Sequence, residues 1–319
     1  MAGFETIVMS IIKLALAMLI GFICLKTKYI TKEQNDGMSK IVVRVTLPLL
    51  IISSLTSMDF DYHKLAMSAE VLAAALCVEA LLFGVGTVMM KMSGLDKPKA
   101  VMLRCMMCFG NVVFMAFPLI QALYGAEGLL YAAVYEIAND GFLWTVGVFS
   151  IRSAAKNESG ASLASNLKRL ANPGTIAFLI AFIMMAFRIK IPGIAGEVVS
   201  GIGSTTTYLS MFFIGGTLAM VDFRRIYRRV WLFILVAVKM VIIPVILIFI
   251  LKWLHFENIT AAVVVLQAAM PTSTVLAVLA NEHKGDVIYC AEGVFISHLL
   301  GLVTLPFVYY MIALIQSSV

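Results

Sequence analysis

The chain has 319 residues, of which 61% are hydrophobic and 13% are charged, with a net charge of +6 and a mean hydropathy of +0.99. A soluble domain carries about 25% charged residues, so this composition excludes a cytosolic enzyme, a nucleic-acid-binding protein and a disordered chain. The apolar runs are roughly 20 residues long, show no alternating polarity and cover the whole chain, which excludes a single anchor and a transmembrane barrel. We therefore predict an all-α polytopic membrane protein.

Ten membrane-spanning helices are predicted, each long enough to cross about 30 Å of hydrocarbon. They cover approximately residues 7–25, 37–57, 66–90, 100–124, 128–151, 173–189, 197–219, 230–251, 259–280 and 287–314. The longest polar stretch, 152–172, is rich in Ser and Ala and is typical of a flexible linker. It separates a first five-helix repeat, 1–151, from a second five-helix repeat, 173–319.

The basic residues predict how the chain is oriented, because Lys and Arg prefer cytoplasmic loops. Seventeen of them lie in or beside the loops after spans one, three, five, seven and nine, and four lie in the loops on the other side. We therefore expect a multi-pass protein of the cytoplasmic membrane with both termini outside and the linker in the cytoplasm.

The fourth span of each half contains a proline in its middle. Pro118 follows Gly110 and Asn111, and Pro271 lies between Gln267 and a Thr-Ser-Thr stretch. Proline removes a backbone donor and fits the first turn of a new helical segment, so we predict that both spans are broken. An odd number of spans in each half also gives the halves opposite orientations, and matched broken helices in such repeats mark a transport site. Two simple kinks are the alternative interpretation.

Segments around these residues resemble the auxin efflux carrier family, which includes bacterial permeases for malate or malonate and the plant auxin exporters. The similar segments are residues 39–48, the stretch from Gly110 and Asn111 through Pro118 to Gly125, Asn172-Pro173, residues 203–207, Gly215-Gly216 and Met270-Pro271. Arg44, Thr46 and Thr207 depart from the family's usual pattern.

The resemblance implies ten transmembrane helices in two inverted five-helix repeats, with broken helices four and nine crossing near the membrane centre. Spans one, two, six and seven would form a scaffold, and the crossing helices and their neighbours would form a transport domain. The implied function is secondary active or facilitative transport of a small organic anion, a malate-like or auxin-like mono- or dicarboxylate, by alternating access at the crossover. A sodium-coupled organic-anion symporter or a cation/proton antiporter of related fold stays open as an alternative.

Helix ends at the two breaks would present backbone N–H groups and the positive end of the helix dipole, which favour a carboxylate. Side chains on the scaffold could face the same site. The candidate substrate-binding residues are Asn111, Pro118, Gln267, Pro271, Thr272 and Ser273, with Thr46, Thr206 and Thr207 from the scaffold. The alternative for each polar side chain is a hydrogen bond to broken or neighbouring backbone of its own helix.

Ionisable residues inside spans are costly and often functional. The candidates for ion coupling are Glu79, Glu136, Asp140, Lys239 and Glu292. Glu136 and Asp140 are four residues apart on one helix face and could bind a proton. An internal salt bridge, for example with Lys239, is the alternative, and Lys239 could instead neutralise the crossover in place of a bound cation. We expect His298 to be a packing residue, and a role as a proton carrier is the alternative.

We expect no enzymatic activity, no cofactor and no metal site, because Cys105 and Cys108 form a single C-x-x-C without a second ligand pair. The expected partners are the organic anion, protons and membrane lipids, without nucleic acid, and a homodimer stays open.

Overall fold

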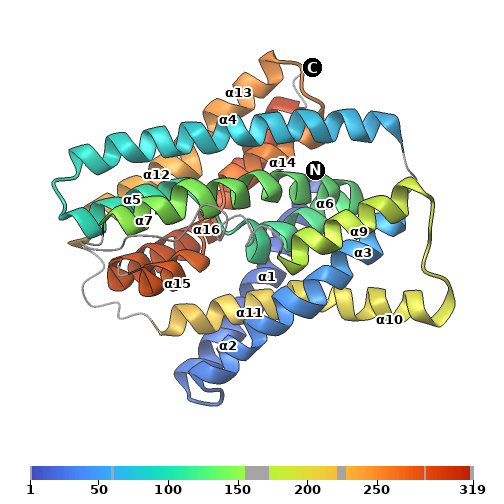
Figure 1. Ribbon diagram of the computed structural model, residues 1–319, viewed down its shortest axis with the longest axis horizontal. Coiled ribbons are helices and arrows are strands. Elements are labelled where there is room, and N and C mark those ends of the chain that lie inside the picture. The colour runs from blue at the N-terminus through green and yellow to red at the C-terminus, as the bar shows by residue number, and fades with distance from the viewer. Residues whose placement is uncertain (1, 59–60, 155–171, 221–227, 284, 317–319) are drawn as a thin grey trace. The chain divides into compact units, whose positions relative to one another are not determined.

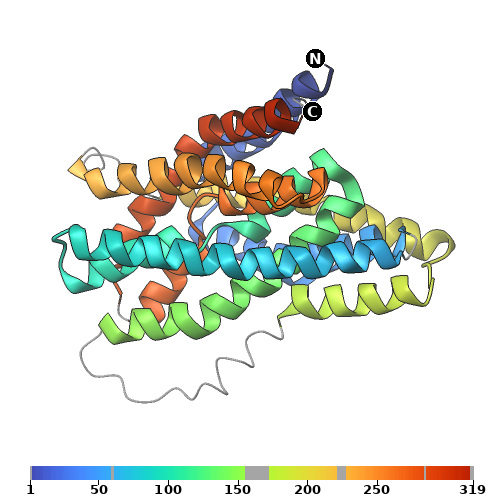
Figure 2. The ribbon, with the colours of Figure 1, turned by 90° about the horizontal axis from the view of Figure 1, so that it is seen from above.

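The computed structural model describes residues 2–58, 61–154, 172–220, 228–283 and 285–316. These residues form helices joined by short loops, as the all-α prediction requires (Figures 1 and 2). The middle of the predicted linker, residues 155–171, and the predicted cytoplasmic residues Arg224 and Arg225 lie outside the described residues.

The helices of the first half lie along the five predicted spans. In the labels, η denotes a π-helical turn. They are α1 (Ala2–Lys26), α2 (Lys32–Ile41), η1 (Val42–Thr46), α3 (Leu47–Thr56), α4 (Tyr62–Met92), α5 (Lys97–Cys108), η2 (Val112–Ala116), α6 (Phe117–Phe142), η3 (Leu143–Gly147) and α7 (Val148–Ala154). Figures 1 and 2 show α4 as one long continuous helix in cyan. Gly125 kinks α6 with a φ of 62°, and this kink separates predicted spans four and five.

The helices of the second half correspond to the other five predicted spans. They are α9 (Pro173–Ala186), α10 (Gly193–Ser204), α11 (Thr206–Ala219), α12 (Val230–Ala237), η6 (Val238–Ile242), α13 (Ile243–Trp253), α14 (Asn258–Ala268), α15 (Val275–Glu282) and α16 (Val287–Gln316). Across the described part of the chain, six helical stretches are long and apolar enough to cross a membrane, and α9 and α14 are shorter apolar helices. The exact arrangement as ten helices in inverted repeats stays a prediction.

Three of the π-helical turns end two residues before a proline. η1 precedes Pro48, η2 precedes Pro118 and η6 precedes Pro244. Proline lacks an N–H group and its ring clashes with the carbonyl four residues earlier, so a wider turn absorbs the misfit while the helix continues. Pro118 therefore lies inside continuous helix, and the prediction that a half-helix begins there is wrong. The break in this span lies earlier, at residues 109–111.

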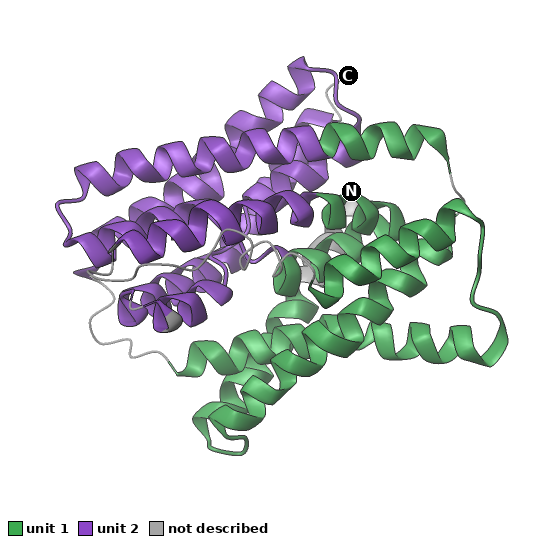
Figure 3. Cartoon of the chain, viewed as in Figure 1, with its two compact units in different colours: residues 1–71, 113–134, 171–220 green, residues 72–112, 135–170, 221–319 purple. Residues whose placement is uncertain are grey.

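The chain forms two compact units, each drawn from both halves of the sequence (Figure 3). The first unit contains residues 1–71, 113–134 and 171–220, and the second contains residues 72–112, 135–170 and 221–319. The first unit thus groups predicted spans one, two, six and seven, which the family resemblance implies as a scaffold, together with residues 113–134 of predicted spans four and five. The two predicted repeats, 1–151 and 173–319, divide the chain differently from these compact units, and the repeats stay a prediction.

Helix α1 packs along α11 within the first unit, and α3 packs against α9 and α10. A Cβ atom at Gly215 would overlap the backbone carbonyl of Met18, and one at Gly21 would overlap that of Phe212. Small residues let backbones approach closely in a membrane, where helices associate through close packing rather than through the hydrophobic effect.

In the second unit, α16 contacts α5, α12, α13, α14 and α15, so it is the central helix of this unit. Its buried face includes Ser297 and His298, about a third of the way along the helix. The side chains of α16 are therefore placed to reach several other elements at once.

We predict that Gly215→Leu lowers the free energy of unfolding by about 1–3 kcal/mol, because the larger side chain must separate α1 from α11. Thermal unfolding of the purified protein in detergent measures the effect. Gly84→Leu on α4 is the control, since a Cβ atom there meets nothing within 4 Å. Equal melting temperatures for the two variants would contradict the close contact.

Candidate functional site

Two interruptions of helical structure meet in the second unit, and we call them together the junction. One is residues 109–111, between α5 and η2, and the other is residues 269–274, between α14 and α15. Gly110 and Thr272 form an antiparallel β-bridge across the junction. A Cβ atom at Gly110 would lie only 3.1 Å from the Cβ atom of Met270, so the close approach leaves little room for a larger residue.

The two segments satisfy each other's backbone hydrogen bonds. The N–H group of Asn111 donates to the carbonyl of Pro271 at 2.7 Å, and that of Ser273 donates to the carbonyl of Phe109 at 3.1 Å. Unpaired backbone groups are very costly in a membrane, so this exchange stabilises both breaks. The N–H groups of Asn111 and Ser273 are therefore occupied, and the expectation that the helix ends present unpaired donors stays a prediction for the other N–H groups.

Helix α16 holds both segments of the junction through two consecutive side chains. The Ser297 hydroxyl accepts from the N–H group of Thr272 at 3.0 Å. The next residue, His298, places its Nε2 atom 2.9 Å from the Nδ2 atom of Asn111. Ser297 is not among the predicted site residues, and His298 is predicted mainly as a packing residue.

The Thr272 hydroxyl is the polar group of the junction that is available to a ligand. Thr272 is 0% exposed, and its Oγ1 atom has no hydrogen-bond partner within the described residues. A buried hydroxyl without a partner costs stability, so its presence needs an explanation. Binding of a polar ligand would satisfy it.

A buried positive charge lies at the end of α5, next to the junction. The Lys239 side chain on η6 is 1% exposed, and its Nζ atom donates to the carbonyl of Met106 at 2.9 Å. In a continuous helix this carbonyl would accept from the N–H group of Gly110, which the break removes. Lys239 therefore replaces the lost donor and complements the negative end of the α5 dipole.

Glu79 of α4 is buried beside the same end of α5. Its Oε1 atom accepts from the amide of Asn139 at 2.9 Å, and its Oε2 atom accepts from the Cys108 thiol at 3.3 Å. Glu79 and Lys239 also interact electrostatically. The Lys239 ammonium group itself donates to the carbonyl of Met106, so a salt bridge with Glu136 or Asp140 stays a prediction.

Glu136 and Asp140 lie one turn apart on α6, and their carboxyl groups interact electrostatically. Asp140 is buried and Glu136 is half-buried. Their arrangement agrees with the predicted shared helix face. Proton binding by this pair stays a prediction.

Glu292 has a structural partner. Arg229, immediately before α12, donates from Nε to Glu292 Oε2 at 2.7 Å and from Nη2 to Oε1 at 3.2 Å. The hydrogen bond to Glu292 raises the pKa of Arg229 above its usual range. This bidentate pair explains the intramembrane carboxylate without ion coupling, and a coupling role for Glu292 stays a prediction.

The junction brings together Asn111, Pro271, Thr272 and Ser273, and Gln267 is buried in the last turn of α14 beside it. The remaining candidates, Pro118, Thr46, Thr206 and Thr207, belong to the first unit. The hydroxyls of Thr46 and Thr206 are buried without a hydrogen-bond partner among the described residues.

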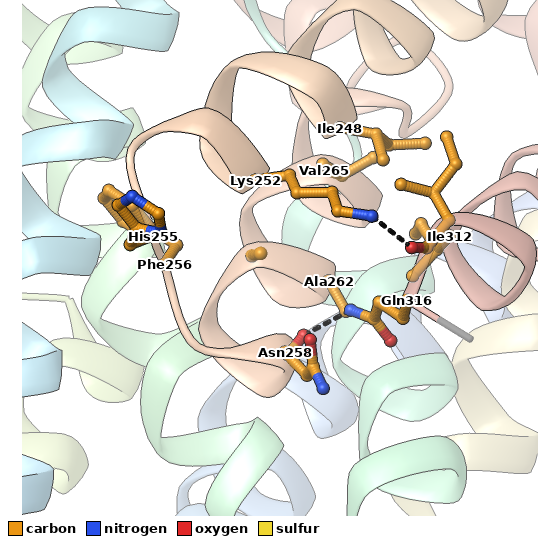
Figure 4. Close-up of a pocket in the computed structure, with 11 residues that line it drawn as sticks. Ile248, Lys252, His255, Phe256, Asn258, Ala262, Val265, Ile312 and Gln316 are labelled. Carbon is orange, nitrogen blue, oxygen red and sulfur yellow. Dashed lines mark hydrogen bonds between the residues drawn. The ribbon is translucent and has the colours of Figure 1, made fainter. Parts of the chain in front are cut away.

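A separate pocket of about 410 Å³ lies at the ends of α13, α14 and α16 (Figure 4). Two hydrogen bonds cross its polar side, from Lys252 Nζ to the carbonyl of Ile315 at 2.9 Å and from Gln316 Nε2 to the carbonyl of Asn258 at 2.8 Å. The pocket contains none of the candidate residues. The junction is therefore the better candidate site. Within the described residues, no three His, Cys, Asp or Glu side chains form a possible metal site.

The chain matches the family described as membrane transport protein over residues 6–309. It is also 27% identical, over 301 residues, to a protein of Methanothermobacter thermautotrophicus named an uncharacterized transporter. That alignment covers 93% of this chain and 95% of the relative. Both similarities therefore extend over nearly the whole chain and include the junction.

We predict that Arg229→Ala lowers the free energy of unfolding by about 2–3 kcal/mol, because it leaves the Glu292 carboxylate buried without its partner. Glu292→Gln in the same background should restore part of the loss, as thermal unfolding of the four proteins of the double-mutant cycle would show. Lys99→Ala is the control, since Lys99 forms a more exposed ion pair with Asp96 and should contribute less than about 1 kcal/mol. A smaller effect for Arg229→Ala than for Lys99→Ala would contradict the assignment.

Proposed function

The chain belongs to this membrane transport family, and from that membership we propose that it carries a small organic anion, a mono- or dicarboxylate, across the cytoplasmic membrane. Membership makes the protein a membrane transporter rather than an enzyme, and it confirms the resemblance to the auxin efflux carriers. The observation that carries the proposal is the junction, where two broken helices meet beside the buried Lys239 ammonium group.

The chemistry of the junction favours a negatively charged substrate. A buried ammonium group attracts an anion strongly because little water screens the charge. The Thr272 hydroxyl is an available donor, and the amide of Asn111 lies on the opposite segment of the junction. Since the backbone donors of Asn111 and Ser273 are occupied, we assign recognition of the carboxylate to these side chains.

Secondary active or facilitative transport by alternating access is the proposed mechanism. The division into two compact units supports it, because the second unit contains the whole junction and could move as one body. The units are joined by covalent connections at residues 71–72, 112–113, 134–135, 170–171 and 220–221. Within this mechanism the two inverted five-helix repeats supply the matched breaks.

The proposed orientation places both termini outside the cell. The basic residues Lys99, Arg152 and Arg229, at the ends of α5, α7 and α12, support it, since such residues prefer the cytoplasmic side. Membrane lipids would surround the apolar helices, and a homodimer is compatible with the proposal.

Protons are the proposed coupling ion. Two carboxylates one turn apart in a buried site repel each other, which favours a proton on one of them, and Glu136 and Asp140 interact electrostatically in this way. Glu79 is a second buried carboxyl group in the same unit.

We predict that Asn111→Ala and Thr272→Val each reduce anion transport by about tenfold or more, the cost of one lost hydrogen bond to a charged ligand. Uptake of radiolabelled malate, malonate and indole-3-acetate into proteoliposomes measures the effect. Thr260→Val is the control for Thr272→Val, because Thr260 is equally buried on α14 but donates to the Glu257 carbonyl. Unchanged uptake in both junction variants would contradict the site.

We predict that Glu136→Gln together with Asp140→Asn abolishes stimulation of uptake by a pH gradient, because neutral amides carry no proton. In the unmodified protein, one coupled proton would raise accumulation by up to about tenfold per pH unit of gradient. Counterflow without a gradient should persist in the variant. Glu70→Gln on the exposed side of α4 is the control, and a pH response that survives in the double variant excludes this pair as the proton carrier.

A further inference from the structure

The contacts of His298 determine which of its ring nitrogens carries the hydrogen. The Nδ1 atom lies 2.8 Å from the carbonyl oxygen of Val294, one turn earlier on α16. A carbonyl oxygen only accepts hydrogen bonds, so Nδ1 is the protonated nitrogen. In the neutral ring Nε2 is then an acceptor, and it receives a hydrogen bond from the Asn111 amide at 2.9 Å.

Adding a proton to Nε2 reverses this contact. The ring then has two N–H groups, and the Nε2 hydrogen would point at the hydrogens of the Asn111 amide nitrogen. The conflict is removed when the amide turns over, so that its Oδ1 atom accepts from Nε2. Only the side chain of Asn111 has to rotate, because its backbone N–H group remains bonded to the carbonyl of Pro271.

We propose that His298 is a positioning residue whose protonation turns the Asn111 amide and thereby makes Asn111 a donor to the transported carboxylate. The proton comes from a hydronium ion in solution, whose O–H bond breaks to leave water as one N–H bond forms at Nε2, and no other covalent bond changes. This inference rests on the proposed function, since it assumes that an organic anion binds at the junction.

The charges around His298 explain why the proton and the anion would bind together. Lys239 on η6 interacts electrostatically with His298, which is 0% exposed. Two neighbouring buried cations repel each other, so the carboxylate would offset the second positive charge. By linkage, the proton would strengthen anion binding as much as the anion strengthens proton binding.

The other elements packed against α16 carry few titratable or charged residues. These residues are Lys97, Lys99, Arg104, Cys105 and Cys108 on α5, Arg229 before α12, Lys252 on α13 and Glu282 on α15. Helix α14 carries no titratable or charged residue. On α16 itself, Glu292 is paired with Arg229.

The test measures binding of malate to the purified protein between about pH 6.5 and 8.5, a range in which malate stays ionised and a histidine titrates. Calorimetry gives the affinity, and a pH-indicator dye in weak buffer gives the protons taken up. We expect the affinity of the unmodified protein for malate to fall by up to about tenfold for each unit by which the pH rises, and we expect protons to be taken up when malate binds.

His298→Gln should bind malate with an affinity that changes less than about twofold over the same range, because glutamine can accept from Asn111 but cannot titrate. His283→Gln is the matched control. His283 is also buried in the second unit, but it contacts Arg152, so this variant should keep the full pH dependence.

The outcomes separate the two proposals. If the unmodified protein binds none of malate, malonate and indole-3-acetate, the proposed function fails, and this inference fails with it. If it binds one of them without proton uptake, or if His298→Gln keeps the pH dependence, only the role of His298 is overturned. The dye measurement needs no variant, so binding without proton uptake overturns the role of His298 even if His298→Gln does not fold.

Discussion

The structure of the second unit depends on one constraint, which is that backbone polar groups inside a membrane need hydrogen-bond partners from the protein. Breaking one helix would leave several such groups unpaired. Two breaks placed against each other form a short β-bridge between Gly110 and Thr272, so backbone groups of each break are paired by the other. Lys239 and Ser297 then supply the partners that the bridge does not provide, for Met106 and Thr272 respectively. A polar site inside an apolar protein follows from this arrangement.

Much of the architecture could be predicted from the sequence, because a span of about 20 apolar residues is a strong signal. The helical segments agree with the ten predicted stretches, and both fourth spans are interrupted. The exact positions of the breaks could not be predicted. Proline marks a misfit in hydrogen bonding, but a π-helical turn can absorb it, as at Pro118, so the helix ends elsewhere.

The candidate site could be predicted only in part. Thr272 and Ser273 follow Pro271 directly, and Asn111 follows Gly110 in a span that also contains Pro118, so local signals are sufficient to find them. Ser297 and His298 carry no such signal, since they lie in the middle of an uninterrupted apolar helix. Their roles arise from α16 packing against the junction, which is a tertiary relation. The partner of Glu292, Arg229, likewise comes from 63 residues earlier in the chain.

The π-helical turns before Pro48, Pro118 and Pro244 have a consequence for comparing sequences in this family. Each wider turn takes up one extra residue, so the helix beyond it is rotated by about 100° relative to a regular helix. At η1 and η6, where the helix continues through the turn, the face that the following helix presents is therefore shifted by about 100°. A relative that lacks one residue at such a turn would still align well, yet it would expose a different set of side chains to the bilayer beyond that point.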